Sequence, residues 1–252
     1  MNLNDDVKFN HKIINIGKTD NKLNRVVDLL FAFIKYPKLN CIVLGDIPLN
    51  MRVRQNIYLH NPNLVNSKYS NLLPIKYIFN KHIFLIFYKL FFKNINIIFL
   101  QSNHMMVNFR NIFHHYIYKY PIKFYKNITP LSDEFSKNLK IIINARKKLK
   151  WDKGLILFYP SAYYPHKNHK FILKILKNKS FSKNIKKIIL TINESDLDIP
   201  SIYKKYIVFL GNIKFKDVIK LYKSSHILFF PSYYESLGLP LIEANAIGMP
   251  IL

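Results

Sequence analysis

The chain has 252 residues, and its 39 Lys and Arg against 14 Asp and Glu give a formal net charge of +25. Half of the residues are hydrophobic and 21% are charged, which excludes a disordered charged tail and leaves ample apolar material for one large domain or two smaller ones. The single cysteine, Cys41, excludes a disulfide framework and a cysteine-based zinc site.

The first 150 residues predict alternating strands and helices. A short apolar run at 13–16 precedes a helix through Ile34, which Tyr36-Pro37 ends. Ser132, followed by two acidic residues, is a typical helix start. The other elements expected here are strands at 41–44, 57–59, 95–100 and 122–125, and helices at about 76–92 and at 103–119.

The remaining residues repeat this alternation. It is typical of parallel sheets that helices cover on both faces. The stretch from Trp151 to Gly154 is the expected seam between two such sheets, so the predicted domains are 1–150 and 151–252. The expected elements of the second domain are strands at 155–159, 187–192, 207–210 and 226–230, and helices at 169–176, 216–222 and 239–247.

The most informative segment is the last one, PSYYESLGLPLIEANAIGMP, at 231–250. Ligands of parallel α/β sheets bind at the carboxyl ends of the strands, near helix N-termini. Glu235 is expected in the loop after a strand, Gly238 permits a close backbone approach, and Pro240 suits the first helical position.

The helix that follows completes a candidate anion site. The backbone amides of Leu237, Gly238 and Leu239 are expected to face a phosphate above the helix. Glu243, expected in the first helical turn, is placed to accept hydrogen bonds from ligand hydroxyls. One short unit therefore supplies two carboxylates and an anion cradle, which a sugar joined to a nucleoside diphosphate needs. The structural alternative is a capped helix with incidental surface glutamates.

This segment resembles the two-glutamate signature of retaining family-4 glycosyltransferases (glycosyl transferases group 1), usually P-S-x-x-E-x-x-G-L-P-x-x-E-A. The resemblance implies a GT-B fold, an α/β architecture of two Rossmann-like domains, and sugar transfer from a nucleotide-diphosphate donor with retention of configuration. The matching residues are Pro231, Ser232, Glu235, Gly238, Leu239, Pro240, Glu243 and Ala244, followed by Gly248 and Pro250.

A second stretch, LILFYPSAYYPHKNHKFILKIL, resembles the first strand and basic loop of the family's nucleotide-binding domain. Lys167 matches a lysine that meets the donor diphosphate, although it is also one of many basic residues. Many members have Gly-Arg where this chain has Pro160-Ser161, so one phosphate ligand is missing or supplied elsewhere. The resemblance implies Glu235 as the catalytic residue, and donor binding by Lys167, Ser236, Leu237, Gly238, Leu239 and Glu243.

The family pattern extends beyond the signature, whereas this sequence stops at Leu252. The resemblance is strong over 151–252 and is mainly one of layout over 1–150. We therefore expect a fragment with an incomplete C-terminal domain, poorly stable and weakly active alone. Two other functions stay open: a nucleotide-sugar epimerase of GT-B-like fold, and an inactive truncated transferase.

Two polar residues of the first domain follow expected strands. His60 ends one strand, and the resemblance makes it a candidate on the acceptor side; a loop histidine with no role is the alternative. Ser102 lies where a helix begins and is either an acceptor-side residue or simply the helix cap. The expected acceptor is a glycan or a lipid-linked glycan.

No cofactor is expected, because the nucleotide-sugar is a substrate and the resembling family is metal-independent. Asp196-Leu197-Asp198 spells a metal-binding Asp-x-Asp pattern, but so short a motif arises often by chance, and we assign it no metal. Nucleic acid is not expected as a partner, since Lys is dispersed through both halves and most aromatic residues fall in core-like runs.

The cytoplasm is the expected compartment, because the polar start lacks the apolar region of a signal peptide. The basic and aromatic stretch at 76–93 suits an interfacial helix, which predicts peripheral contact with an anionic membrane. A buried helix whose lysines reach solvent is the alternative. The high net charge itself indicates either an anionic partner or a compositional bias with a solvated basic surface.

Overall fold

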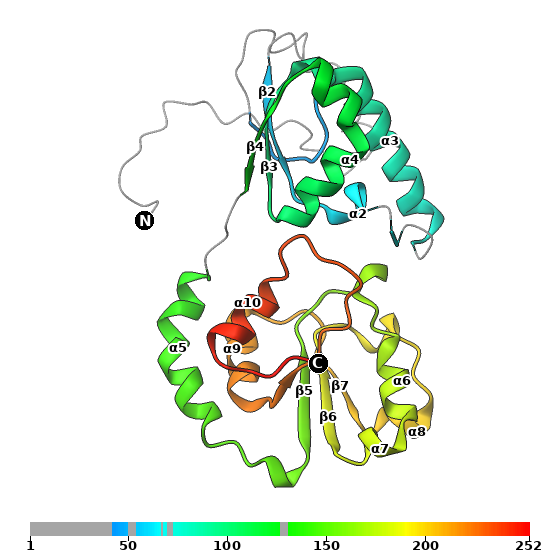
Figure 1. Cartoon of the computed structure of the whole chain (residues 1–252). Coiled ribbons are helices and arrows are strands. Elements are labelled where there is room, and N and C mark those ends of the chain that lie inside the picture. Colours follow the sequence, from blue (N-terminus) through cyan, green and yellow to red (C-terminus); the bar gives the residue numbers. More distant parts are fainter. Residues whose placement is uncertain (1–41, 50–53, 67, 70–72, 127–130) are drawn as a thin grey trace. The chain divides into compact units, whose positions relative to one another are not determined.

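A computed structural model describes residues 42–49, 54–66, 68–69, 73–126 and 131–252 (Figure 1). The strand expected at 13–16 and the helix expected through Ile34 lie outside these residues. The described strands form two four-stranded sheets, in the orders β1-β2-β3-β4 and β7-β6-β5-β8. The first sheet lies almost entirely in one compact unit of the chain, and the second sheet lies in another.

The first sheet follows the expected layout. Its β1 and β2 run parallel, with Ile42 opposite Asn56. All four expected strands and both long helices are confirmed, within two residues at each end. The elements are β1 (Ile42–Val43), β2 (Gln55–Leu59), α2 (Pro62–Val65), α3 (Ile75–Phe91), β3 (Ile95–Leu100), α4 (Asn103–Lys119) and β4 (Lys123–Lys126).

Aromatic side chains join α3 to α4. Phe84 and Tyr88 of α3 are fully buried, and their ring centroids lie 6.0 and 5.1 Å from that of Phe113 in α4. Aromatic pairs at such distances add to the stability that burial alone provides. The Tyr88 hydroxyl donates to the Asp46 carbonyl oxygen at 3.1 Å, so its polar end is also satisfied.

The second sheet is wholly parallel. Its central strand β5 pairs with β6 on one side and with β8 on the other; Leu157 lies opposite both Ile188 and Ile227. The elements are α5 (Asp133–Arg146), β5 (Leu155–Tyr159), α6 (Phe171–Lys177), α7 (Lys179–Ser182), β6 (Ile185–Leu190), α8 (Ser201–Lys204), β7 (Ile207–Phe209), α9 (Phe215–Ser224), β8 (Ile227–Leu228) and α10 (Leu239–Ala246).

Helices bury both faces of this sheet, as the strand–helix alternation predicts. Leu157 and Tyr159 of β5 point into one hydrophobic cluster, and the intervening Phe158 points into the other. Phe135 and Ile142 of α5 pack in the Phe158 cluster, so α5 belongs to the core of the second sheet although it precedes Trp151. The domain boundary at 150/151 stays a prediction.

The structure corrects the position of one site residue. Helix α10 begins at Leu239, and its first turn contains no acidic residue. Glu243 therefore lies in the second turn rather than the first, and Pro240 is the second helical residue. The helix ends as expected, since Gly248 follows it with φ +62°. The three four-residue helices α2, α7 and α8 were not anticipated, because so short a segment carries no helical periodicity.

Among the described residues, no helix combines the length and the apolar character that crossing a membrane requires.

Candidate functional site

The candidate site lies at the carboxyl edge of the second sheet. The loop after β5 and the segment after β8 leave from adjacent parallel strands. Segments that follow neighbouring parallel strands emerge on the same edge, which is where ligands of such sheets bind. The topology thereby brings Lys167 close to Glu235, which lies 68 positions away in the sequence.

Hydrogen bonds fix these two segments to each other. The buried Tyr159 hydroxyl donates to the Lys167 carbonyl oxygen at 2.9 Å and bonds the Ser232 hydroxyl at 2.8 Å. The Asn168 side-chain amide donates to the Pro231 carbonyl oxygen at 3.1 Å. Asn168 adopts a left-handed conformation, φ +54°, that asparagine tolerates better than most residues. The loop that carries Lys167 is thus held against the segment that carries Glu235.

Lys167 and Glu235 form a two-pronged ion pair. The Lys167 ammonium donates to both carboxylate oxygens of Glu235 at 2.8 Å. The two side chains are only 18% and 16% exposed, so the pair is partly shielded from water. Removing either partner would leave the other charge partly buried and uncompensated. The structure thus pairs the expected catalytic carboxylate with the expected phosphate ligand.

Gly238 shapes the backbone between Glu235 and α10. Its φ is +72°, and an added Cβ would lie 3.1 Å from Leu241 Cδ1, so this turn favours glycine. The first helical bond runs from the Leu241 amide to the Gly238 carbonyl oxygen at 2.9 Å. The amides of Gly238 and Leu239 therefore have no carbonyl within the helix to bond. Ser236, Leu237, Gly238 and Leu239 line a pocket together with Lys167 and Glu235.

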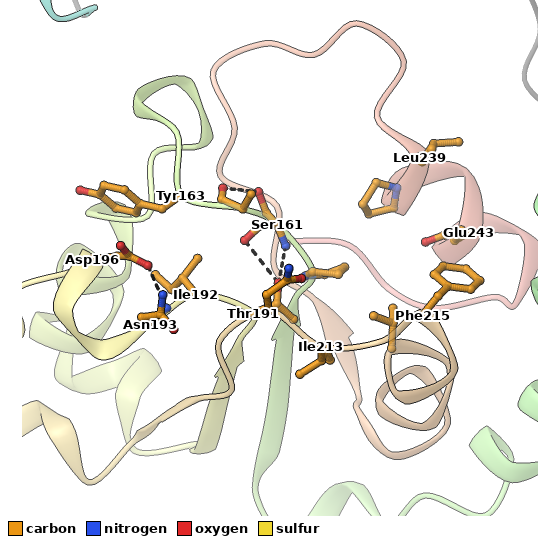
Figure 2. Close-up of a pocket in the computed structure, with 15 residues that line it drawn as sticks. Ser161, Tyr163, Thr191, Ile192, Asn193, Asp196, Ile213, Phe215, Leu239 and Glu243 are labelled. Atoms are coloured by element: carbon orange, nitrogen blue, oxygen red, sulfur yellow. Dashed lines mark hydrogen bonds between the residues drawn. The ribbon is translucent and has the colours of Figure 1, made fainter. Parts of the chain in front are cut away.

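A second pocket adjoins this one and shares Pro160, Ser161, Leu239 and Pro240 with it. Its volume of about 530 Å³ is typical of small-molecule sites. Figure 2 shows Glu243 on one side of this pocket, Asp196 and Tyr163 on the other, and Ser161 between them.

Glu243 is 7% exposed and lines the second pocket from α10. One of its carboxylate oxygens, Oε2, accepts a hydrogen bond of 2.7 Å from the Tyr222 hydroxyl. Burial raises the pKa of Glu243, and the Tyr222 hydrogen bond opposes that shift. Tyr222 thereby fixes the orientation of the carboxylate.

Hydrogen bonds from backbone amides to side-chain oxygens hold segments that line the second pocket. The Ser161 amide donates to the Thr191 hydroxyl oxygen at 2.9 Å, which ties the end of β5 to the end of β6. Asp196 accepts from the Asn193 amide at 2.9 Å and completes a capping box there. This cap gives Asp196 a structural role. Within the described residues, no group of three or more His, Cys, Asp or Glu is arranged to hold a metal ion.

The positive charge of the site comes from one side chain. Of the described residues that line the two pockets, only Lys167 is basic. Ser161, which stands where many family members have arginine, adds no charge. Within the described lining, the second phosphate ligand that the resemblance led us to expect is therefore not replaced by another cation.

Two buried histidines beside Lys167 were missed by the sequence reasoning. Burial, with a smaller contribution from Lys167, lowers the pKa of both His166 and His169 to about 4. Both rings are therefore neutral at pH 7. His166 stacks on Tyr164 and Tyr234, with ring centroids 5.8 and 5.2 Å away. The only sequence signal was their position in the Lys167 loop.

The two candidates of the predicted first domain follow strands of the first sheet and are not among the residues that line the two pockets. His60 directly follows β2 and is exposed. Ser102 precedes α4, and its hydroxyl accepts a long hydrogen bond of 3.4 Å from the Met105 amide. This bond is the helix cap that the sequence left as the alternative for Ser102. An acceptor-side role for either residue stays a prediction.

Comparison with known proteins relates the second sheet to a family. Residues 141–252 match the family model of glycosyl transferases group 1. No curated protein sequence matches this chain.

Two solved structures share the fold. The first is sucrose-phosphate synthase from Thermosynechococcus elongatus, with 17% identity and a TM-score of 0.52; the match covers 80% of this chain and 50% of that one. The second is WaaG, a glycosyltransferase involved in lipopolysaccharide biosynthesis, with 14% identity and a TM-score of 0.59; the match covers 94% of this chain and 66% of that one. The chain thus spans half to two thirds of these structures and has the α/β GT-B architecture.

Proposed function

We propose that this protein is a glycosyltransferase that binds a nucleotide-sugar and transfers the sugar to a glycan or lipid-linked acceptor with retention of configuration. The observation that carries the proposal is the Lys167–Glu235 pair beside the Gly238 turn, with the buried carboxylate of Glu243 in the adjoining pocket. The family match over 141–252 supports the same reaction class.

The two adjoining pockets suit the two parts of such a donor. In the proposal, the nucleoside occupies the larger pocket, and its ribose hydroxyls donate to Glu243. The Tyr222 hydroxyl already occupies one carboxylate oxygen of Glu243, which leaves the other oxygen as the acceptor for a ribose hydroxyl. The diphosphate then lies toward Lys167 and the amides of Gly238 and Leu239, which favour an anion.

Donor binding requires Lys167 to change partners. In the structure its ammonium is occupied by Glu235. We infer that an incoming diphosphate takes over the ammonium and releases the Glu235 carboxylate toward the donor sugar. The carboxylate then stabilises positive character at the anomeric carbon as the bond to the diphosphate breaks, and both bonding electrons leave with the diphosphate oxygen. Lys167 stabilises the charge that develops on this leaving group, an electrostatic contribution that is often large.

The remaining assignments also belong to the proposal. The acceptor hydroxyl oxygen forms the new bond on the face that the diphosphate leaves, and its proton departs with the diphosphate. His60 and Ser102 are the acceptor-side candidates, a hexose is the expected sugar, and the cytoplasm is the expected compartment. We expect no metal requirement.

The test is a donor assay that separates binding from turnover. Uridine, guanosine and adenosine diphosphate hexoses are incubated with the protein, and release of the nucleoside diphosphate is followed with and without added glycan and with EDTA. Glu235→Gln should lower turnover about 100-fold or more. It should leave nucleoside diphosphate binding unchanged or tighter, because Lys167 loses its competing carboxylate.

Three outcomes would contradict the proposal. Loss of nucleotide binding in Glu235→Gln would overturn the role of Glu235, and loss of turnover in EDTA would overturn metal independence. Conversion of the donor to its epimer, with no release of diphosphate, would identify an epimerase instead. Glu134→Gln serves as the matched control, because Glu134 is exposed on α5 and lines neither pocket.

A further inference from the structure

Helix α3 has one buried face and one exposed apolar face. Phe84 and Tyr88 are fully buried against the core. The opposite face carries four large apolar side chains, which we call the α3 stripe. The α3 stripe consists of Ile75, Phe79, Ile86 and Leu90, which are 84, 64, 54 and 61% exposed.

The spacing of the α3 stripe gathers its four members on one side of the helix, where the exposed His82 separates the pair Ile75 and Phe79 from the pair Ile86 and Leu90. Its members are separated by four, seven and four residues, which places all of them within one narrow sector of a helix with 3.6 residues per turn. The stripe runs along nearly the whole of the 17-residue helix, roughly 25 Å. A helix at the surface of a globular protein normally presents polar residues on this side. Large apolar side chains that gather on one exposed surface often mark an interaction site.

Exposed lysines border the α3 stripe. Lys76 and Lys89 lie on either side of it along the helix, and Lys93 follows the end of the helix; all three are exposed. Lys81 is different, because it lies toward the buried side and donates to the Asn66 carbonyl oxygen at 2.6 Å. Burial lowers the pKa of Lys81. The structure thus retains three of the four lysines that the sequence placed on an interfacial helix.

The charge around the α3 stripe has a single sign over a long stretch of sequence. Between Asp46 and Asp133 the chain contains no Asp or Glu, while it contains eleven Lys and Arg. All of α3 and all of α4 lie in this acid-free stretch. Arg110 and Lys119 of α4 are exposed as well. A partner that covers the α3 stripe therefore meets positive charge and no negative side chain from this segment.

The exposed apolar side chains and the positive charge around them together indicate which kind of partner binds here. A second copy of this chain would bring the same cationic surface, so its charges would repel. Nucleic acid would satisfy the charge but offers phosphates rather than an apolar layer to the stripe. An anionic lipid bilayer satisfies both requirements, because its headgroups attract lysines while its acyl boundary accepts apolar side chains from a helix lying in the interface.

We propose that the α3 stripe and its flanking lysines dock this protein on an anionic membrane surface, with α3 in the plane of the interface. Ile75, Phe79, Ile86 and Leu90 enter the acyl boundary, while Lys76, Lys89 and Lys93 meet lipid phosphates. The inference does not depend on the proposed chemistry, since α3 supplies no residue to the Glu235 or Glu243 site.

The test is co-sedimentation of the full chain with vesicles of phosphatidylcholine alone or mixed with phosphatidylglycerol. Wild type should bind the mixed vesicles and release in high salt. Phe79→Ser with Leu90→Ser should lower the affinity at least about tenfold, and Lys76→Glu with Lys89→Glu should do the same. The matched controls are Ile141→Ser with Ile202→Ser, and Lys177→Glu with Lys216→Glu, which change exposed residues of α5, α8, α6 and α9 by the same chemistry. The controls should bind like wild type.

Several outcomes would overturn the proposal. Equal binding to neutral and anionic vesicles would contradict the proposed contact between the lysines and lipid phosphates. No binding to either kind of vesicle would contradict membrane docking altogether. Equal losses in the stripe variants and the controls would show that α3 is not the contact. If size-exclusion chromatography with light scattering showed a dimer that the stripe variants dissociate, the stripe would be a contact between copies instead.

Discussion

The carboxyl edges of the two sheets differ in what their loops do. In the second sheet, the segments after β5 and β8 bond to each other and bring Lys167 onto Glu235. In the first sheet, the residues after β2 and β3 cap the next helices: Asn61 accepts from the Asn63 amide at 3.1 Å, and Ser102 caps α4.

Similar strand–helix layouts therefore serve different purposes. Buried apolar strands and covering helices are common to both sheets, and they position the loops without supplying chemistry. Among the described residues, an ion pair that is partly shielded from water, Lys167 with Glu235, lies at the edge of the second sheet. Helix α3, beside the first sheet, instead exposes lysines and apolar side chains together. The predictions below test this contrast between the two regions, beginning with the largest expected effect.

Acid should destabilise the second region more than the first. The folded pKa of His166 and His169, about 4, lies below the unfolded value of about 6.5, so the unfolded chain binds more protons between these pH values. The two neutral rings therefore contribute to the free energy of unfolding above pH 6.5. This contribution is lost as the pH falls toward 4, by at most about 3 kcal/mol for each ring.

The variant His169→Phe keeps an aromatic ring beside Tyr159 but cannot titrate. In urea unfolding at pH 7 and pH 4.5, it should lose less stability on acidification than wild type. His114→Phe, on the exposed side of α4, should match wild type. An unchanged pH dependence in His169→Phe would show that this ring does not cause the acid sensitivity.

Charge removal at Lys167 should affect nucleotide binding strongly. The variant Lys167→Ala loses a hydrogen-bonded charge worth about 1.5–3 kcal/mol, which corresponds to roughly 10- to 150-fold weaker nucleoside diphosphate binding. Turnover should fall further, since the same charge meets the leaving group. Lys170→Ala is the control, because Lys170 is exposed three residues away. Equal binding by both variants in calorimetry would remove Lys167 from the donor site.

The loss of stability on replacing a glycine by alanine should also differ between the two regions. Gly238→Ala forces alanine into a left-handed conformation and against Leu241, so it should cost about 1–2 kcal/mol of unfolding free energy. Gly45→Ala in the first region meets nothing within 4 Å and should be nearly neutral. Chemical denaturation of the two variants makes the comparison. If Gly238→Ala were as stable as wild type, the turn would not be constrained as described.

The smallest effect is expected at Ser102. Its hydrogen bond to the Met105 amide is long, so Ser102→Ala should lower the free energy of unfolding by only about 0.5 kcal/mol, near the lower end for helix caps. Nucleoside diphosphate affinity should not change. A large loss of transfer to an acceptor, with stability and donor binding intact, would instead place Ser102 on the acceptor side.

Much of the fold could be predicted because its elements are marked locally. The continuous apolar run LILFY gives β5 its predicted bounds of 155–159, and the bounds of α4 agree as well. Strand β6 was predicted at 187–192 but spans Ile185–Leu190. Ile192 extends the apolar run past the ladder, where its carbonyl oxygen bonds the Gly211 amide. Two lysines after Ile185 obscured the start of the strand.

The residues of the candidate site could be proposed from sequence where they belong to one motif, but their contacts depend on tertiary packing. Glu235, Gly238 and Glu243 stand out through their spacing in one segment. The ion pair of Lys167 with Glu235 depends on β5 and β8 being neighbours, and strand order is not written in local periodicity. The Tyr222–Glu243 hydrogen bond and the burial of His166 likewise arise from side-chain packing.

The measurement that tests the central claim most directly is a calorimetric titration of the protein with uridine, guanosine and adenosine diphosphates. At least one of them should bind with a stoichiometry of one. Glu243→Gln should weaken it about 10- to 150-fold, while Glu194→Gln, which changes an exposed carboxylate outside both pockets, should leave it unchanged. No binding of any of the three, or equal affinity in wild type and Glu243→Gln, would contradict a nucleotide site at the edge of the second sheet.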